Sequence, residues 1–151
     1  KGLRSGTHNV PASVGLGLAS ELALSEMNAE VERLTLLRDR LIQGVLKIVP
    51  GSRLNGHPTK RLCNNAHLSL PRLGTDEVTL GLRRFAYSSS SACSSGSLSH
   101  VLSALPNGPN LEWTHLRFGL GKSTTDEVVT LLLESIAKLV PSNKMSGFIS
   151  L

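Results

Sequence analysis

Cys93 is the residue of this sequence whose surroundings point most directly to chemistry. Seven of the ten residues from 88 to 97 are serine, and the cysteine is flanked by alanine and serine rather than by large apolar residues. Such a segment should be exposed and mobile, so a thiol in it could travel to a substrate and act as a nucleophile, for example on a sulfur atom. The residues leave open the alternative of an idle surface thiol.

Arg117 is a second candidate, because it lies between Leu116 and Phe118 in a stretch that alternates like a strand. In that register its side chain points away from the face of its two apolar neighbours. The side chain either reaches solvent or lines a pocket, where the planar guanidinium group would bind a carboxylate through two hydrogen bonds.

Three other patterns do not predict a site. Residues 119–124 look like the end of a phosphate-binding loop, but Leu116 stands where that motif needs its first glycine. His57, Cys63 and His67 match no zinc spacing, so we expect no metal site. The 16 Lys and Arg residues form no long basic run, so we expect no nucleic-acid partner.

The length and composition predict one globular domain over residues 1–151, with 142–151 as a flexible tail. The chain is 40% hydrophobic and 18% charged, with a formal net charge of +5, and it is long enough to bury a core without disulfides. No apolar run approaches the roughly 20 residues of a membrane span, so we expect no membrane partner. Two cysteines make no disulfide framework, which favours the cytoplasm, or an organelle matrix or stroma. The start at Lys1, on a turn-like segment, suggests a fragment.

Helical periodicity dominates the first third of the chain. A short helix is predicted over 11–23 and a longer amphipathic helix over 25–48, with charged residues such as Arg38 on its polar face. Apolar residues recur in the longer helix at spacings of three and four: Val31, Leu34, Leu37, Leu41, Val45 and Ile48.

Short strands and helices alternate in the remainder. Strands are predicted over 53–55, 66–70 and 113–120. Helices are predicted over 75–85, 97–105 and 124–140, and the last of them should begin with a capping box of Thr124 and Glu127. This order predicts an α+β fold, with a small, mainly antiparallel sheet packed against helices and a long N-terminal helical segment.

With these elements in view, four stretches resemble the C-terminal part of cysteine desulfurases. They are RSGTHNVP at 4–11, LNGHP at 54–58, SSSSACSSGS at 88–97 and LRFGLGKSTT at 116–125. The family comprises NifS/IscS-like enzymes of the class V aminotransferase group, which have fold type I and use pyridoxal 5'-phosphate. The resemblance extends over residues 1 to about 140, and the serine-rich stretch is its most specific part.

The resemblance implies a role for each candidate residue. Cys93 would take the sulfur of L-cysteine as a persulfide and release L-alanine, and the sulfur would pass to an acceptor or scaffold protein for iron–sulfur cluster assembly. Arg117 would bind the substrate carboxylate. Thr7 would reach the phosphate of the cofactor in the partner subunit of a homodimer.

Two departures from the family limit what the chain could do alone. Ser90 stands where the family usually has glycine, and none of the lysines follows a histidine, as the Schiff-base lysine of the family does. The chain thus resembles only the small domain and a linking helix, without the cofactor-binding domain, and we expect it to be inactive in isolation. Two other interpretations stay open: a non-catalytic module that accepts a persulfide or docks an acceptor, and part of a selenocysteine lyase.

Overall fold

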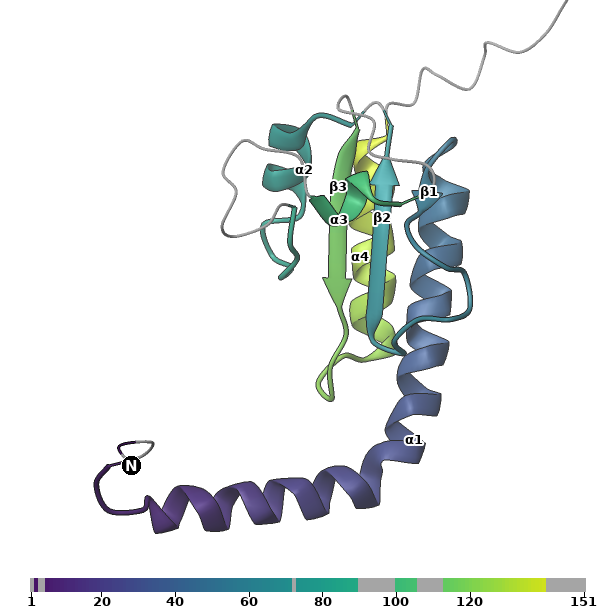
Figure 1. Cartoon of the computed structure of the whole chain (residues 1–151). Coiled ribbons are helices and arrows are strands. Elements are labelled where there is room, and N and C mark those ends of the chain that lie inside the picture. Colours follow the sequence, from purple (N-terminus) through teal and green to yellow (C-terminus); the bar gives the residue numbers. More distant parts are fainter. Residues whose placement is uncertain (1, 3–4, 72, 90–99, 106–112, 141–151) are drawn as a thin grey trace, which may run out of the picture.

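The computed structural model describes residues 2, 5–71, 73–89, 100–105 and 113–140. A long helix is followed by a small sheet and shorter helices (Figure 1). The elements, in chain order, are α1 (Val10–Ile48), β1 (Arg53–Leu54), β2 (Asn65–Leu70), α2 (Thr75–Gly81), α3 (His100–Ser103), β3 (Thr114–Gly119) and α4 (Asp126–Leu139). The predicted flexible tail lies outside the described residues.

Helix α1 is continuous over 39 residues, so the predicted break near residue 24 was wrong. No proline or glycine stands between residues 18 and 43 to interrupt the backbone hydrogen bonds. Asn9 caps the start, because its Oδ1 accepts a hydrogen bond from the backbone N–H of Ala12 at 3.1 Å. Figure 1 shows that the helix bends where it leaves the sheet and extends away as an arm.

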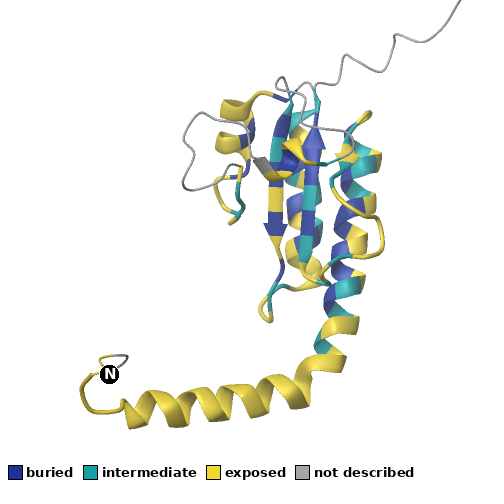
Figure 2. Cartoon of the chain, in the orientation of Figure 1, coloured by how far each residue is buried: buried dark blue, intermediate teal, exposed yellow. Residues whose placement is uncertain are grey.

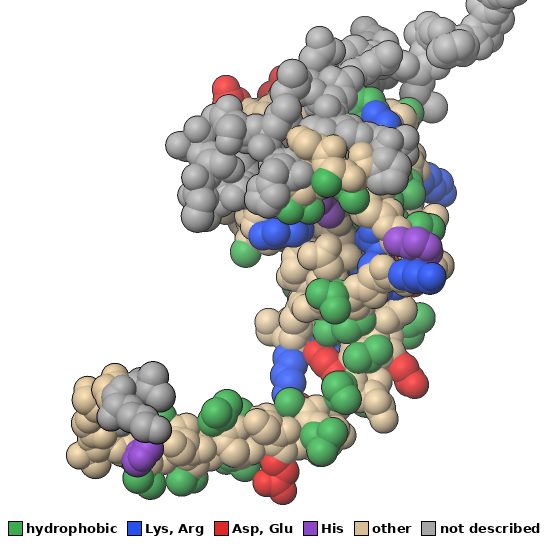
Figure 3. All heavy atoms as spheres, in the orientation of Figure 1, with side chains coloured by type: hydrophobic (Ala, Val, Ile, Leu, Met, Phe, Trp, Pro, Cys, Tyr) green, Lys and Arg blue, Asp and Glu red, His purple; other side chains and the backbone are tan. Residues whose placement is uncertain are grey.

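Only the C-terminal part of α1 packs against the rest of the described chain. Residues 10–29 are all exposed (Figure 2), and hydrophobic side chains are spaced along this arm (Figure 3). These apolar residues are Val10, Val14, Leu16, Leu18, Leu22, Leu24 and Met27. The buried residues of α1 are Leu34, Leu37, Arg38, Leu41, Ile42 and Val45.

The exposure of Val31 and the burial of Arg38 contradict the predicted apolar and polar faces of α1. Val31 is 43% exposed, because it lies where the arm begins, whereas Arg38 is only 6% exposed. The buried guanidinium group of Arg38 is satisfied by the carboxylate of Asp39 at 2.8 Å and by the carbonyl oxygen of Leu62 at 3.0 Å. Hydrogen bonds and an opposite charge thus offset the cost of burying this arginine.

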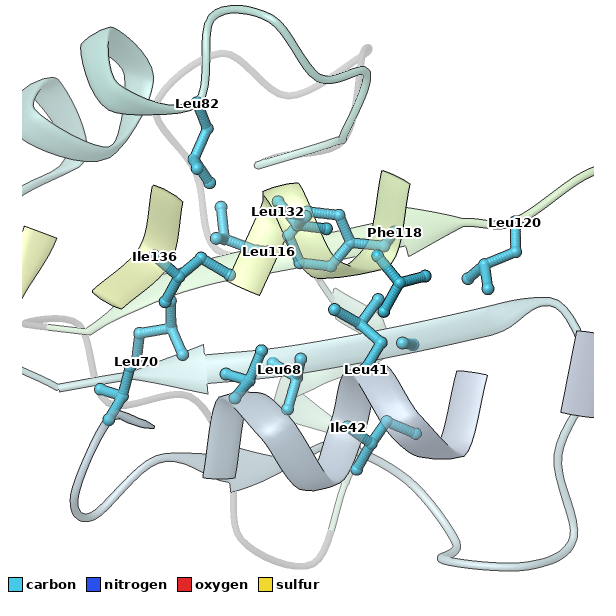
Figure 4. Packing of buried hydrophobic residues seen from close by; sticks show 14 of the residues in the cluster. Leu41, Ile42, Leu68, Leu70, Leu82, Leu116, Phe118, Leu120, Leu132 and Ile136 are labelled. Atoms are coloured by element: carbon cyan, nitrogen blue, oxygen red, sulfur yellow. The ribbon is translucent and has the colours of Figure 1, made fainter. Parts of the chain in front are cut away.

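The three strands form an antiparallel sheet in the order β1-β2-β3, which confirms the predicted fold class. Leu68 of β2 lies opposite Leu116 of β3. Because successive side chains alternate between faces, both residues point to the face that α1 and α4 cover. Leu41 and Ile136 complete the core there (Figure 4). The predicted packing of the helix on the sheet is therefore confirmed for its C-terminal part, from Leu34 to Val45, whereas residues 25–29 are exposed.

Several helix boundaries differ from the predicted ones. Helix α2 ends at Gly81 rather than near 85, and α3 is limited to four residues within the described part of the chain. Helix α4 is capped by Thr125, whose hydroxyl accepts from the N–H of Val128 at 3.4 Å. The predicted cap, Thr124, instead accepts from the N–H of Gly121 at 2.9 Å and so closes the β3–α4 turn.

Arg33 of α1 ties this turn to the long helix. Its Nη1 donates to the carbonyl oxygen of Thr124 at 2.6 Å, and its Nη2 donates to that of Gly121 at 3.1 Å. Lys122 of the turn also pairs with Glu26 of α1. The end of β3 is thereby fixed relative to α1. Among the described residues, no helix combines the length and the hydropathy of a bilayer span.

Candidate functional site

The face of the sheet opposite the helices carries polar side chains from two strands. In β2 the residues of this face include His67 and Ser69, and in β3 they include His115 and Arg117. The register pairs His67 with Arg117 and Ser69 with His115, so the four side chains form two neighbouring cross-strand pairs. We refer to these four residues as the polar sheet face.

Arg117 is the cation of this face. Its side chain is exposed, and its backbone forms a bridge with Ser88, with hydrogen bonds of 2.8 Å and 3.0 Å in the two directions. Its Nη2 also donates to the hydroxyl of Ser88 at 3.4 Å. Within the described part of the chain, no carboxylate lies within ion-pair distance of Arg117.

His67 stands beside this arginine in its neutral form. The pKa of His67 is lowered from 6.5 to about 4, chiefly by burial and in addition by electrostatic interaction with His115, Arg117 and Arg61. The rings of His67 and His115 meet edge to face, with their centroids 6.5 Å apart. At neutral pH the imidazole of His67 thus offers a polar but uncharged neighbour to Arg117.

The second pair of the polar sheet face belongs to a hydrogen-bond network. The hydroxyl of Ser69 lies 2.8 Å from Nδ1 of His115 and accepts from the side-chain amide of Asn55 at 2.8 Å. Ser69 is buried, whereas His115 is half-buried. This network fixes the side chains next to Arg117 and leaves no orphaned polar atom on Ser69.

The other predicted site residues do not lie beside Arg117 in the described part of the chain. Thr7 is exposed and precedes α1, whose N-terminal end lies far from the sheet (Figure 1). Cys93 lies outside the described residues. Cys63 is half-buried and packs against the core. No group of three His, Cys, Asp or Glu side chains suited to a metal ion occurs within the described ranges.

An apolar cavity of about 480 Å³ lies between the end of β3 and α4. Phe118, Leu120 and Leu132 contribute to its walls, and none of its lining residues is titratable. It offers space but no acid, base or fixed charge. Among the described residues, the polar sheet face is therefore a better candidate site than this cavity, because it carries titratable and charged side chains.

Sequence reasoning singled out Arg117 but missed its neighbours. The alternation at 66–70 already places His67 and Ser69 on one face, so this signal was available. The strand register was not available, because nothing local in the sequence says that residue 67 pairs with residue 117. The bridge to Ser88 was hidden for the same reason.

Comparisons with known proteins identify close relatives over most of the chain. No protein-family model matches it. A cysteine desulfurase IscS of Methanosarcina thermophila is 43% identical over 141 residues, which cover 91% of this chain and 35% of that protein. Cysteine desulfurase IscS 1 of Archaeoglobus fulgidus is 45% identical over 146 residues, which cover 93% and 37%. A cysteine desulfurase of Mus musculus is 38% identical over 136 residues, which cover 89% and 30%.

Solved structures agree with the sequence relatives. A NifS-like protein from Rickettsia africae matches with a TM-score of 0.72 and 25% identity, over 91% of this chain and 36% of its own. Another NifS-like protein matches with a TM-score of 0.73 and 27% identity, over 91% and 35%. These findings confirm the resemblance seen in the sequence: the chain is a homologue of the cysteine desulfurases of the IscS and NifS-like type and spans about a third of their length.

Proposed function

We propose that this chain is the C-terminal small domain of a cysteine desulfurase that depends on pyridoxal 5'-phosphate. The parent enzyme would take sulfur from L-cysteine, release L-alanine and deliver the sulfur for iron–sulfur cluster assembly. The observation that carries the proposal is Arg117: an exposed arginine without a carboxylate partner among the described residues, in a chain related to cysteine desulfurases over 91% of its length.

Arg117 has the properties that a carboxylate-binding residue needs. A guanidinium group presents parallel N–H donors that match the two oxygens of a carboxylate. Its neighbour His67 is neutral at pH 7, so it neither repels the arginine nor competes for the anion. We assign Arg117 to the carboxylate of the bound cysteine.

Cys93 would act as the nucleophile of the sulfur transfer. Its thiolate attacks the sulfur of the substrate, so that a sulfur–sulfur bond forms and the carbon–sulfur bond of cysteine breaks. The electron pair of the broken bond stays with carbon, which gains a proton and becomes the methyl group of alanine. Cys93 is left as a persulfide, and no external oxidant is needed.

The residues of this chain do not make a complete site for the cofactor. The enzymes it resembles hold pyridoxal 5'-phosphate on a lysine that follows a histidine, and no lysine here has that neighbour. Of the described lysines, Lys122 pairs with Glu26 at the β3–α4 turn, Lys47 and Lys138 lie in the last turns of helices, and Lys60 is exposed between β1 and β2. The cofactor and its lysine would belong to the remainder of the parent enzyme, and the isolated chain would be inactive.

The exposed arm of α1 supports a place within a larger assembly. Helices that are apolar around much of their circumference are usually buried, and residues 10–29 are exposed here. We propose that the rest of the parent enzyme covers this arm. At its start, Thr7 would contribute to the phosphate site of the partner subunit in a homodimer. A sulfur-acceptor or scaffold protein would be a transient partner, in the cytoplasm or in an organelle matrix or stroma.

The test is alanine release from L-cysteine by the parent enzyme carrying Cys93→Ser, with Cys63→Ser as the matched control. We expect Cys93→Ser to abolish both alanine release and the persulfide detected by mass spectrometry. Cys63→Ser should retain both, because Cys63 packs against the core away from the polar sheet face. Normal turnover by Cys93→Ser would refute the proposal. A strong preference of the parent enzyme for L-selenocysteine over L-cysteine would instead identify the parent enzyme as a selenocysteine lyase.

A further inference from the structure

Arg117 is held from both sides by neighbouring backbone. On one side β2 pairs His67 with it, and on the other side Ser88 bridges to it. The N–H of Ser88 donates to the carbonyl oxygen of Arg117 at 3.0 Å, and the N–H of Arg117 donates to that of Ser88 at 2.8 Å. These two backbone hydrogen bonds fix the position of the Ser88 Cα atom relative to Arg117.

The hydroxyl of Ser88 reaches the end of the arginine side chain. It accepts a hydrogen bond from Nη2 at 3.4 Å. A free arginine side chain has many rotamers, and it loses this conformational entropy when it becomes ordered. The hydrogen bond from Nη2 to Ser88, whose backbone is fixed, restricts the guanidinium group before a carboxylate binds. Binding of the carboxylate then costs less side-chain entropy.

The contact leaves the arginine able to bind. A guanidinium group carries five N–H donors, and Ser88 engages one terminal nitrogen. A serine hydroxyl is neutral, so it orients the group without neutralising its charge. A carboxylate at the same place would form an ion pair with Arg117 and compete with the substrate.

From this geometry we infer that Ser88 is a positioning residue that sets the orientation of Arg117 for carboxylate binding. The inference rests on the proposed function of Arg117 and adds to it a residue that does not itself touch the substrate. A role of this kind predicts a change in KM for L-cysteine rather than in kcat, because the contact exists before the substrate binds.

The experiment compares Ser88→Ala, Ser88→Thr and Ser89→Ala in the parent enzyme. We expect Ser88→Ala to raise KM for L-cysteine by about three- to tenfold, the range for loss of one hydrogen bond of ordinary net strength, with kcat within about twofold. Ser88→Thr keeps a hydroxyl and suits extended backbone, so it should restore KM. Ser89 is exposed and one residue out of register, so Ser89→Ala should behave like the wild type.

A double variant separates positioning from general damage. In the background of Arg117→Ala, adding Ser88→Ala should raise KM no further, because nothing remains to be oriented. An additive effect, or a failure of Ser88→Thr to restore KM, would overturn the positioning role. If Arg117→Ala lowers kcat/KM but Ser88→Ala leaves KM unchanged, only the role of Ser88 falls. If Arg117→Ala itself has no effect, both assignments fall.

Discussion

His67 and Arg117 form a non-hydrogen-bonded pair across the β2–β3 ladder. The backbone N–H and carbonyl of Arg117 bond to Ser88, and the carbonyl of His67 accepts from the N–H of Asn55, the residue after β1, at 2.8 Å. Side chains of such pairs lie closer together than those of hydrogen-bonded pairs. The register therefore brings an imidazole and a guanidinium group together on the polar sheet face.

Burial of His67, with a smaller contribution from the nearby Arg117, makes the stability of the chain depend on pH. The pKa of His67 is about 4 in the folded chain and 6.5 without the fold, so between these values the unfolded chain binds a proton that the folded chain does not. The contribution is complete above pH 6.5 and is lost as the pH falls toward 4. We expect a loss of about 1–2 kcal/mol, because solvent screens part of the effect at a half-buried group.

Urea unfolding of the wild type and of His67→Gln at pH 7.5 and pH 4.5 would measure this dependence. Carboxylates also titrate in this window, so the relevant quantity is the difference between the two proteins. The wild type should lose more stability than the variant on acidification. Equal losses of stability in the two proteins would show that folding does not lower the pKa of His67.

Replacing Arg117 should impair use of cysteine by the parent enzyme. We expect the bound carboxylate to be shielded from water in the parent enzyme, where loss of its charge partner typically costs about 2–5 kcal/mol. This corresponds to a decrease in kcat/KM of about 30-fold to several thousand-fold for Arg117→Ala. Arg117→Lys keeps the charge but not the paired donors, so it should recover only part of this loss. Steady-state alanine production provides the measurement.

The control is Arg83→Ala, which removes an exposed arginine in the turn after α2. It should leave kcat/KM close to that of the wild type. A near-normal kcat/KM for Arg117→Ala would mean that this arginine is only a solvated strand residue.

The two cysteines should differ in their reaction with thiol reagents. Cys63 is half-buried against the core, whereas Cys93 stands in a serine-rich sequence. Accessibility and thiolate fraction together set the rate of alkylation, so we expect Cys93 to be modified first. Mass spectrometry after brief treatment with iodoacetamide would show which peptide carries the label. Earlier modification of Cys63 would contradict a role for Cys93 as a nucleophile.

Adjacent leucines of α4 should differ in their contribution to stability. Leu132 is 5% exposed and faces the sheet, whereas Leu131 is 53% exposed. Leu132→Ala should lower the free energy of unfolding by about 2–4 kcal/mol, since it removes buried surface and leaves a cavity. Leu131→Ala should change it by less than about 1 kcal/mol. Chemical denaturation of both variants tests this, and similar losses would contradict the packing of α4 on the sheet.

Much of the fold could be predicted because its signals are local. The alternation at 66–70 and 113–120 and the apolar spacing from Leu34 to Val45 each report one face of one element. The predicted break in α1 near residue 24 was wrong. The composition changes there, but the residues on both sides are compatible with a helical backbone. The buried Arg38 could not be foreseen, since its partner Leu62 is a backbone group distant in sequence.

The candidate site was predictable only in part, for a related reason. Arg117 stands out within its own strand, but the residues that orient it come from other segments. Ser88 is 29 positions away and His67 is 50 positions away. A pairing register depends on how whole strands pack, and the composition around any one residue does not encode it.

The exposed arm of α1 implies that one continuous helix contains two regions of very different local stability. An isolated helical segment of about 20 residues is marginal in water, because nucleation and end fraying compete with its hydrogen bonds. Backbone amides of residues 10–29 should therefore exchange with deuterium through local opening. Those near Leu41 and Val45 should exchange only when the sheet also opens. Protection from exchange would then fall along α1 toward its N-terminus, even though its hydrogen-bond geometry is helical throughout.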